Sequence, residues 1–478
     1  NRKRVRGGTL ASDPMMELRR VLGFKDLVFF YTLTCFSLRW IATAAEAGPS
    51  SLVVWVLAAC GLFVPLVASV LELSTRHPEE GGLYVWTRRA FGDFPGFMAG
   101  FLYWASNLPF FPALLYFTAA NALFLGGAKG AALQESRGFF LTFSLLGVIL
   151  ASAANVRGLK YATWLHNAAA VATWIPAILL VVSSSVVFAR FGPATSFSAS
   201  QLVPSLGFKD ALFFSTIAFA FGGIEAASFL GGEIRDPRRN LPRALLVAGA
   251  LITAAYLAGT ASLLVALPAS EASGLTGITK GIAAASAKAG LPAMGTLAAL
   301  LVTFSGVGVT GAWLATSARL PFVGGLDRFL PPAFAKLHPR WGTPAVAILV
   351  QSALSALFVL LSQAGTGVKG AYDALVAMSV IAYFVPFLFL FASTIRLSRA
   401  PLPEGAIRIP GGRPVSVALA ALGFLTTAVS LILAFVPPGS EPDKIFAAAK
   451  IVALTILLVA GGAALYVASA RRRRTPRA

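Results

Sequence analysis

The sequence predicts an all-α integral membrane protein of about twelve transmembrane helices. Of its 478 residues, 57% are hydrophobic and only 12% are charged, whereas a soluble domain carries about 25% charged residues. The apolar residues gather in runs of roughly 20, the length at which an α-helix crosses about 30 Å of hydrocarbon. Most of the 39 Lys and Arg residues fall between these runs, in alternate loops.

The apolar runs divide into two sets of six. The first set lies near residues 26–46, 50–73, 95–125, 139–155, 161–189 and 209–231. The second set lies near residues 243–267, 293–318, 343–362, 370–395, 415–436 and 445–470. Short connections rich in Gly, Pro and charge separate the runs, so no separate soluble domain is expected.

The net charge of +20 is explained by membrane orientation rather than by a nucleic-acid partner. Placing the N-terminus inside puts most Lys and Arg residues on the cytoplasmic side, including those at 2–6, 235–243 and 471–474. Both termini are therefore predicted to be cytoplasmic, and nucleic-acid binding is excluded.

Two basic segments near the ends of the chain suggest contacts with membrane lipids. Within the N-terminal tail 1–25, residues 15–25 place apolar side chains among Arg19, Arg20 and Lys25, which suits an interfacial amphipathic helix. In the C-terminal tail 471–478, four consecutive arginines suit anchoring to anionic headgroups.

Residues that bind metals or catalyse reactions do not cluster in this sequence. Cys35 and Cys60 both fall inside apolar runs, so no disulfide framework is expected. His77 and His338 lie in loops without metal-ligand spacing, and no Cys/His or His/Asp/Glu set has catalytic spacing. The sequence therefore predicts neither an enzyme nor a bound metal or cofactor.

Polar or Gly-rich interruptions occur inside two predicted spans, the first and the sixth. The first carries Thr32, Thr34, Cys35, Ser37 and Arg39, and the sixth carries the run FAFGGIE at 219–225. A backbone break at membrane depth requires surrounding protein or a water-filled cavity. Broken helices at positions 1 and 6 predict two inverted five-helix repeats, 26–190 and 208–396, followed by two helices in 414–470.

A broken helix offers free N–H groups at a positive dipole end and free carbonyl groups at the other end. An amino-acid zwitterion suits both. The candidate substrate-binding residues are Thr34, Cys35, Phe36, Ser37 and Arg39 in the first span, with Phe219, Phe221, Gly222 and Gly223 in the sixth. The alternative is that Gly222 and Gly223 only allow close helix packing.

Glu225 and Arg39 are the two ionisable side chains nearest these interruptions. An intramembrane carboxylate is a functional candidate, so Glu225 is expected to carry a proton or hold a gate, unless it only braces the unwound segment. Arg39 could attract an acidic substrate side chain. Its alternatives are a structural pair with Glu46 or Glu72, or extension to the outer membrane surface.

Proton coupling is also considered for His166, which titrates near neutral pH, although a His near a helix end is more often interfacial. Thr316 and Ser317 offer oxygens to a sodium ion. Hydroxyls on a membrane helix more often bond their own backbone, so sodium coupling is not predicted.

Several motifs resemble those of the amino acid–polyamine–organocation (APC) superfamily. They are EL at 72–73 with PEEGGLYVW at 78–86, and GIE at 223–225 with EIRDPRRNLPR at 233–243. Within the superfamily, bacterial glutamate/GABA antiporters are the most similar, through PALLYF at 112–117, LPPAFAK at 330–336, IPGG at 409–412 and FVPP at 435–438. Residues 35–40 depart from the superfamily, whose members commonly have a Gly-Ser-Gly-Ile-Phe-like break there.

The resemblance implies the five-plus-five inverted-repeat (LeuT-type) fold in the bacterial inner membrane. It also implies amino-acid transport by alternating access, with exchange of neutral or acidic amino acids as the expected mode and proton-coupled uptake as the alternative. Phe219 lies six residues before Glu225, where similar transporters place an aromatic that closes over the substrate. Gly222 lies where a broken-helix carbonyl meets the amino group. A membrane sensor or a channel remains as a rival function.

Overall fold

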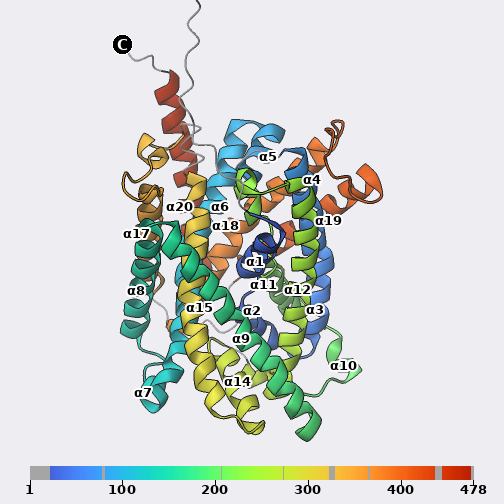
Figure 1. Cartoon of the computed structure of the whole chain (residues 1–478), viewed down its shortest axis with the longest axis vertical. Helices are drawn as coiled ribbons and strands as arrows, with labels where there is room; N and C mark the ends of the chain where they lie inside the picture. Colours follow the sequence, from blue (N-terminus) through green and yellow to red (C-terminus); the bar gives the residue numbers. More distant parts are fainter. Residues whose placement is uncertain are drawn as a thin grey trace, which may run out of the picture.

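The computed structural model describes residues 22–77, 81–205, 207–272, 274–321, 329–363, 367–436 and 444–474. These residues form helices joined by turns and short loops (Figure 1). Among them, the only strand-like pairing is an isolated parallel bridge between Leu22 and Ile234. The predicted all-α class is confirmed. Most of the predicted interfacial helix at 15–25, the loop residues 78–80 and the tail residues 475–478 lie outside the described residues.

Ten helices in the described residues are long and apolar enough to cross a membrane, and one bent pair makes an eleventh. The bent pair is α1 (Phe24–Cys35) with α2 (Leu38–Ala45), which together form the first predicted span. The sixth predicted span consists of α11 (Phe208–Phe219), an irregular segment and the 3-10 helix η3 (Ala226–Glu233). Because it is interrupted, no continuous helix there is long enough to cross on its own.

The other spans are continuous or nearly so. In the first half they are α3–η1–α4 (Ser50–Ala58, Ala59–Phe63 and Val64–Arg76), α6 (Asp93–Ala122), α8 (Arg137–Val156) and α9 (Leu159–Phe191). In the second half they are α12 (Pro237–Ala266), α15 (Ala293–Ser317), α17 (Ala345–Ser362) and α18 (Val368–Leu397), followed by α19 (Gly412–Leu433) and α20 (Lys444–Arg474). Short pieces connect them: η2 (Leu123–Gly126), α7 (Gly127–Ala131), α10 (Ala199–Leu202), α13 (Ala269–Ala272) and η4 (Pro332–Ala335).

Two connecting helices that the hydrophobic runs did not predict follow the inverted symmetry. Helix α5 (Gly82–Phe91) comes after the second span of the first half, and α14 (Gly277–Lys288) comes after the second span of the second half. They lie at opposite ends of the molecule (Figure 1), as expected when the second half is inverted relative to the first. We call these the α5 end, where the C-terminal helix also emerges, and the α14 end.

The spans pack in two groups, and each group contains spans from both halves of the chain. Helices α6 and α8 of the first half pack against α15 and α17 of the second. Helices α1, α2 and α3 of the first half pack against α12, and α11 packs against α2 and α3. Outward-facing apolar side chains such as Ile149 and Ile432, which are 60% and 70% exposed, fit a surrounding of lipid.

The break in the first span is two residues long. After Cys35 the backbone of Phe36 and Ser37 is extended, and α2 then starts at a 42° angle to α1. The first N–H groups of α2 have no acceptor within that helix, so its positive dipole end points into the break.

The break in the sixth span depends on Gly223. Its φ of +112° is a conformation that residues with a side chain rarely adopt. A Cβ on Gly223 would also stand 2.7 Å from the carbonyl oxygen of Thr34. The hydroxyl of Thr34 lies 3.2 Å from the carbonyl oxygen of Gly223. That carbonyl shares the one hydroxyl proton with the carbonyls of Phe30 and Tyr31. The two breaks therefore touch each other directly.

Candidate binding site at the two helix breaks

One tyrosine from α12 joins both breaks. The Tyr256 hydroxyl lies 2.6 Å from the carbonyl oxygen of Cys35 and 3.1 Å from that of Ala220, and it accepts the N–H of Ser37 at 3.2 Å. A hydroxyl has one proton to donate, so the two carbonyls share it. Tyr256 therefore replaces, in part, the helical hydrogen bonds that both spans lose. It is not among the residues predicted from the sequence.

A small cavity lies beside the breaks, with a volume of about 40 Å³. It is walled by α1, α2, α6, α11, α15 and α18, through Leu33, Thr34, Cys35, Phe36, Ser37, Trp40, Ser106, Asn107, Phe110, Leu114, Phe219, Gly222, Val309, Trp313 and Tyr383. None of these lining residues carries a charge. Space of this size holds roughly three water molecules.

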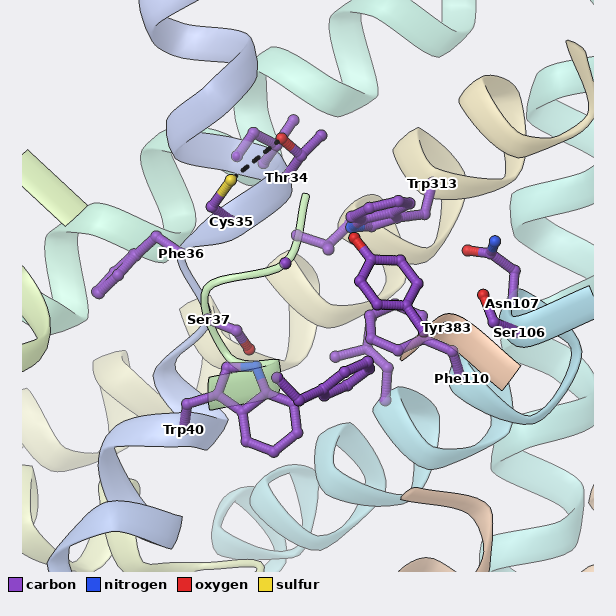
Figure 2. Close-up of a pocket in the computed structure, with 15 residues that line it drawn as sticks. Thr34, Cys35, Phe36, Ser37, Trp40, Ser106, Asn107, Phe110, Trp313 and Tyr383 are labelled. Atoms are coloured by element: carbon purple, nitrogen blue, oxygen red, sulfur yellow. Dashed lines mark hydrogen bonds between the residues drawn. The ribbon is translucent and has the colours of Figure 1, made fainter. Parts of the chain in front are cut away.

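Six of the predicted site residues line this cavity. They are Thr34, Cys35, Phe36 and Ser37 at the first break, and Phe219 and Gly222 at the second. Gly223 lies immediately behind Gly222, against Thr34. Figure 2 shows Ser37 and Trp40 on one side of the cavity and Ser106, Asn107 and Trp313 on the other.

Phe219 and Phe221, two residues apart, point in different directions. Phe219 meets Trp40 and Tyr383 edge to face, with ring centroids 5.5 and 5.3 Å apart. Phe221 packs instead against Trp55 and Phe63, with centroids at 5.3 and 4.7 Å, and it does not line the cavity. The ring of Phe36 also turns aside and stacks on Trp174 at 4.6 Å.

Glu225 is fully buried and accepts three hydrogen bonds. Its Oε1 accepts the hydroxyl of Tyr103 at 2.6 Å and the hydroxyl of Tyr383, and its Oε2 accepts the N–H of Gly223 at 3.0 Å. Tyr383 also lines the cavity, so a single side chain separates the carboxylate from it. Neither tyrosine was identified from the sequence, because nothing in an apolar run marks which tyrosine faces a carboxylate on another helix.

Arg39 and His166 lie outside the cavity lining. Arg39 is 2% exposed, with its guanidinium over the rings of Trp40 and Phe110, so it does not extend to the membrane surface. His166 lies near Gly311 of α15, where a Cβ would stand 3.5 Å from its Nε2. Thr316 and Ser317 donate to the carbonyls four residues before them, as anticipated for membrane hydroxyls.

Polar side chains of α6 give the cavity a feature that the sequence analysis missed. Ser106 and Asn107 direct hydrogens to the Tyr103 carbonyl at 2.7 and 3.0 Å. The amide oxygen of Asn107 and both lone pairs of the Ser106 hydroxyl remain available as acceptors. Their position in a long apolar run was the available signal, because polar residues inside a span tend to face a bundle interior or a cavity.

Known proteins resemble this chain over most of its length. An uncharacterised transporter of Legionella pneumophila is 27% identical over 445 residues, which cover 90% of this chain and 92% of that protein. A serine/threonine exchanger of Bacillus subtilis is 25% identical over 327 residues, covering 67% and 70% of the two chains. The crystal structure of MhsT in complex with L-phenylalanine has the same fold, with a TM-score of 0.57, 13% identity and coverage of 85% of this chain and 97% of that one.

A family profile described as amino acid permease matches residues 22–461, which takes in both breaks and all the spans that wall the cavity. This agrees with the expected resemblance to the APC superfamily and with the expectation that the chain is a transporter rather than an enzyme. The chain belongs to the amino acid permease family.

Proposed function

We propose that this permease exchanges neutral or acidic amino acids across the bacterial inner membrane by alternating access. The observation that carries the proposal is the cavity at the contact between the two helix breaks. Alternating access would move the group of spans around α12 against the group around α6 and α15, since each group draws helices from both proposed repeats, 26–190 and 208–396.

The breaks offer complementary groups to an amino-acid zwitterion. The start of α2 presents N–H groups and a positive dipole end, which favour a carboxylate. The carbonyls of residues 217–220 accept hydrogen bonds, whereas the Gly222 carbonyl, in the turn after α11, accepts no backbone N–H of the described residues and favours an ammonium group. Because the lining residues are uncharged, a zwitterion of zero net charge can enter the cavity without leaving a protein charge unpaired.

Polar side chains in the cavity wall favour a substrate that carries a hydroxyl. Ser106 and Asn107 provide hydrogen-bonding groups opposite Ser37, which would suit a substrate hydroxyl. The similarity to a protein named as a serine/threonine exchanger supports the same substrate class.

The membrane orientation proposed for the chain puts the α5 end in the cytoplasm. Arg76, Arg88 and Arg89 lie at or beside α5, and the basic C-terminal helix emerges at the same end (Figure 1). Positively charged loops are retained on the cytoplasmic side. The α14 end would then face outward, with both termini in the cytoplasm.

Proton-coupled uptake is the second candidate mechanism. The fully buried Glu225, one tyrosine away from the cavity, is the observation that favours it. A membrane sensor for amino acids is the rival from another class, and it would bind amino acids without catalysing flux.

Exchange predicts that substrate on one side accelerates flux from the other. We expect liposomes preloaded with unlabelled serine to take up labelled serine several-fold faster than empty liposomes, without a pH gradient. Uptake into empty liposomes that requires an inward proton gradient would instead identify proton coupling. Binding of amino acids with no flux under either condition would favour the sensor.

Phe219 is proposed to close over the bound substrate, since it stands between Trp40 and Tyr383 at the cavity wall. We expect Phe219→Ala to raise the apparent KM for serine about tenfold, because an aromatic contact and its buried area are lost. Phe221→Leu serves as the matched control, because Phe221 packs away from the cavity and Leu keeps the site apolar. Equal effects of the two substitutions on KM would contradict the gate.

A further inference from the structure

Arg39 is a buried cation enclosed by aromatic rings. Its guanidinium carbon lies 4.1 Å from the ring centroid of Trp40 and 5.1 Å from that of Phe110. The hydroxyl of Tyr372 on α18 is adjacent and interacts with it. With 2% of the residue exposed, the guanidinium is almost completely shielded from water.

Two of the three guanidinium nitrogens of Arg39, Nε and Nη1, have no hydrogen-bond acceptor. These two nitrogens carry three N–H groups. Neither carboxylate suggested by the sequence is available: Glu72 pairs with Arg76 at 3.0 Å, and Glu46 is exposed and forms no ion pair with Arg39. Asp373, next to Tyr372, pairs with Lys369 at 3.1 Å. Across the described part of the chain, Arg39 therefore has no anionic partner.

The surrounding rings do not compensate for a buried charge. A desolvated cation–π contact contributes less than the cost of burying an unpaired ion. Each donor left without an acceptor adds a further cost. An anion that entered this site would satisfy both the charge and the free N–H groups, so its binding would be favourable.

This enclosed cation lies directly next to the proposed substrate cavity. Trp40 and Phe110 belong both to the cavity wall and to the aromatic shell around Arg39, so one layer of rings separates the two. Tyr372 precedes Tyr383 on α18 by 11 residues, or roughly 16 Å of helix, which puts Arg39 on the α14 side of the cavity. That side is the outer one in the orientation proposed above.

We propose that Arg39, with the Tyr372 hydroxyl and the faces of Trp40 and Phe110, forms an anion-binding subsite on the outer side of the cavity. Its ligand is a monovalent anionic group, either the side-chain carboxylate of an acidic amino acid or a chloride ion. A substrate carboxylate as the ligand rests on the proposed amino-acid exchange, whereas chloride as the ligand does not.

Glutamate and glutamine have the same backbone and side-chain length, and differ in whether the side chain ends in a carboxylate or an amide. Comparing their binding therefore isolates the contribution of the carboxylate. The experiment measures their binding to the purified full-length protein from ligand-induced shifts in Tm, with sulfate, which is larger and divalent, as the only other anion. A second arm titrates sodium chloride against sodium sulfate at constant ionic strength without amino acid. Both arms compare the unmodified protein with Arg39→Gln and with Arg190→Gln, which removes the same charge from an exposed position at the end of α9.

If a carboxylate is the ligand, glutamate binds the unmodified protein at least about tenfold more tightly than glutamine, as for a charge-assisted hydrogen bond. Arg39→Gln abolishes this ratio and Arg190→Gln preserves it. If chloride is the ligand, chloride raises the Tm of the unmodified protein and of Arg190→Gln, but not of Arg39→Gln.

The proposal is overturned if the unmodified protein shows neither a glutamate preference nor a chloride effect, which requires no variant to fold. It is also overturned if Arg39→Gln keeps whichever response the unmodified protein has. The same holds if Arg39→Gln weakens the binding of glutamate and glutamine equally and chloride does not change the Tm of the unmodified protein. Serine exchange, measured separately on the unmodified protein, tests the proposed function. If the unmodified protein shows no serine exchange but has an anion response that depends on Arg39, exchange is rejected and the anion-binding subsite is supported.

Discussion

Replacement of Gly222 by Leu is expected to abolish amino-acid transport while the protein stays folded in detergent. A Cβ at this position would stand 2.5 Å from Cε1 of Tyr383 and 2.9 Å from its hydroxyl oxygen. Tyr383 cannot simply move aside, because its hydroxyl is bound to Glu225. The remaining atoms of a Leu side chain would enter the cavity and occupy the space next to the α11 carbonyls.

The measurement is exchange of labelled serine in liposomes, with size-exclusion chromatography as the check on folding. Gly138→Leu is the matched control, since a Cβ there has no atom within 4 Å apart from its chain neighbours and the backbone of its own helix, and the position is exposed on α8. Gly138→Leu should exchange at the unmodified rate. Near-normal exchange by Gly222→Leu would remove the second break from the substrate site.

Hydropathy predicted the spans well because membrane helices must pair all their backbone groups internally and present apolar side chains to lipid. It did not predict α5 and α14. These helices lie in the connections between spans, where charged and small residues interrupt the apolar pattern, so length and hydropathy do not mark them as helices. The structure shows them as helices at opposite ends of the molecule (Figure 1).

The breaks were predictable from local composition, but the directions of their side chains were not. Phe219 ends α11, and Phe221 follows in a turn that leads into Gly223 with its φ of +112°. Helical periodicity no longer applies there, so sequence spacing cannot tell which ring faces the cavity. Tyr103, Tyr256 and Tyr383 were missed for a different reason. They lie in regular helices of three other spans, and the sequence does not show which of these helices pack against the breaks.

The charged residues were found because an ion inside an apolar span is conspicuous, yet their partners depended on packing. Arg39 was considered as a partner of Glu46 or Glu72, and the structure has neither pair, since Glu72 binds Arg76 and Ser416. Arg76 lies one helical turn after Glu72 on the same helix, which makes that local pair easy to form. Arg39 is therefore left with aromatic neighbours.

Replacement of Glu225 by Gln is expected to lower transport about 10- to 100-fold, which corresponds to one or two unsatisfied buried groups. The carboxylate accepts from Tyr103 and Tyr383 through Oε1 and from the Gly223 N–H through Oε2. A glutamine has one acceptor oxygen and an NH₂ group that only donates. Its NH₂ group must therefore face either the two tyrosine hydroxyls or the Gly223 N–H, all of which donate to the carboxylate. If the oxygen stays with the tyrosines, the Gly223 N–H loses its acceptor and the break is destabilised.

The pH profile of exchange separates a coupling role of Glu225 from a bracing role. We expect the unmodified protein to change its exchange rate with pH and Glu225→Gln to change much less, because the amide cannot gain or lose a proton in this range. Glu46→Gln, at an exposed carboxylate just after α2, controls for a change in total charge and should keep the unmodified profile. A reduced rate with an unchanged pH profile would mean that Glu225 only braces the break at Gly223. A near-normal rate with an unchanged profile would remove Glu225 from the site, because the three donors would then tolerate an amide in its place.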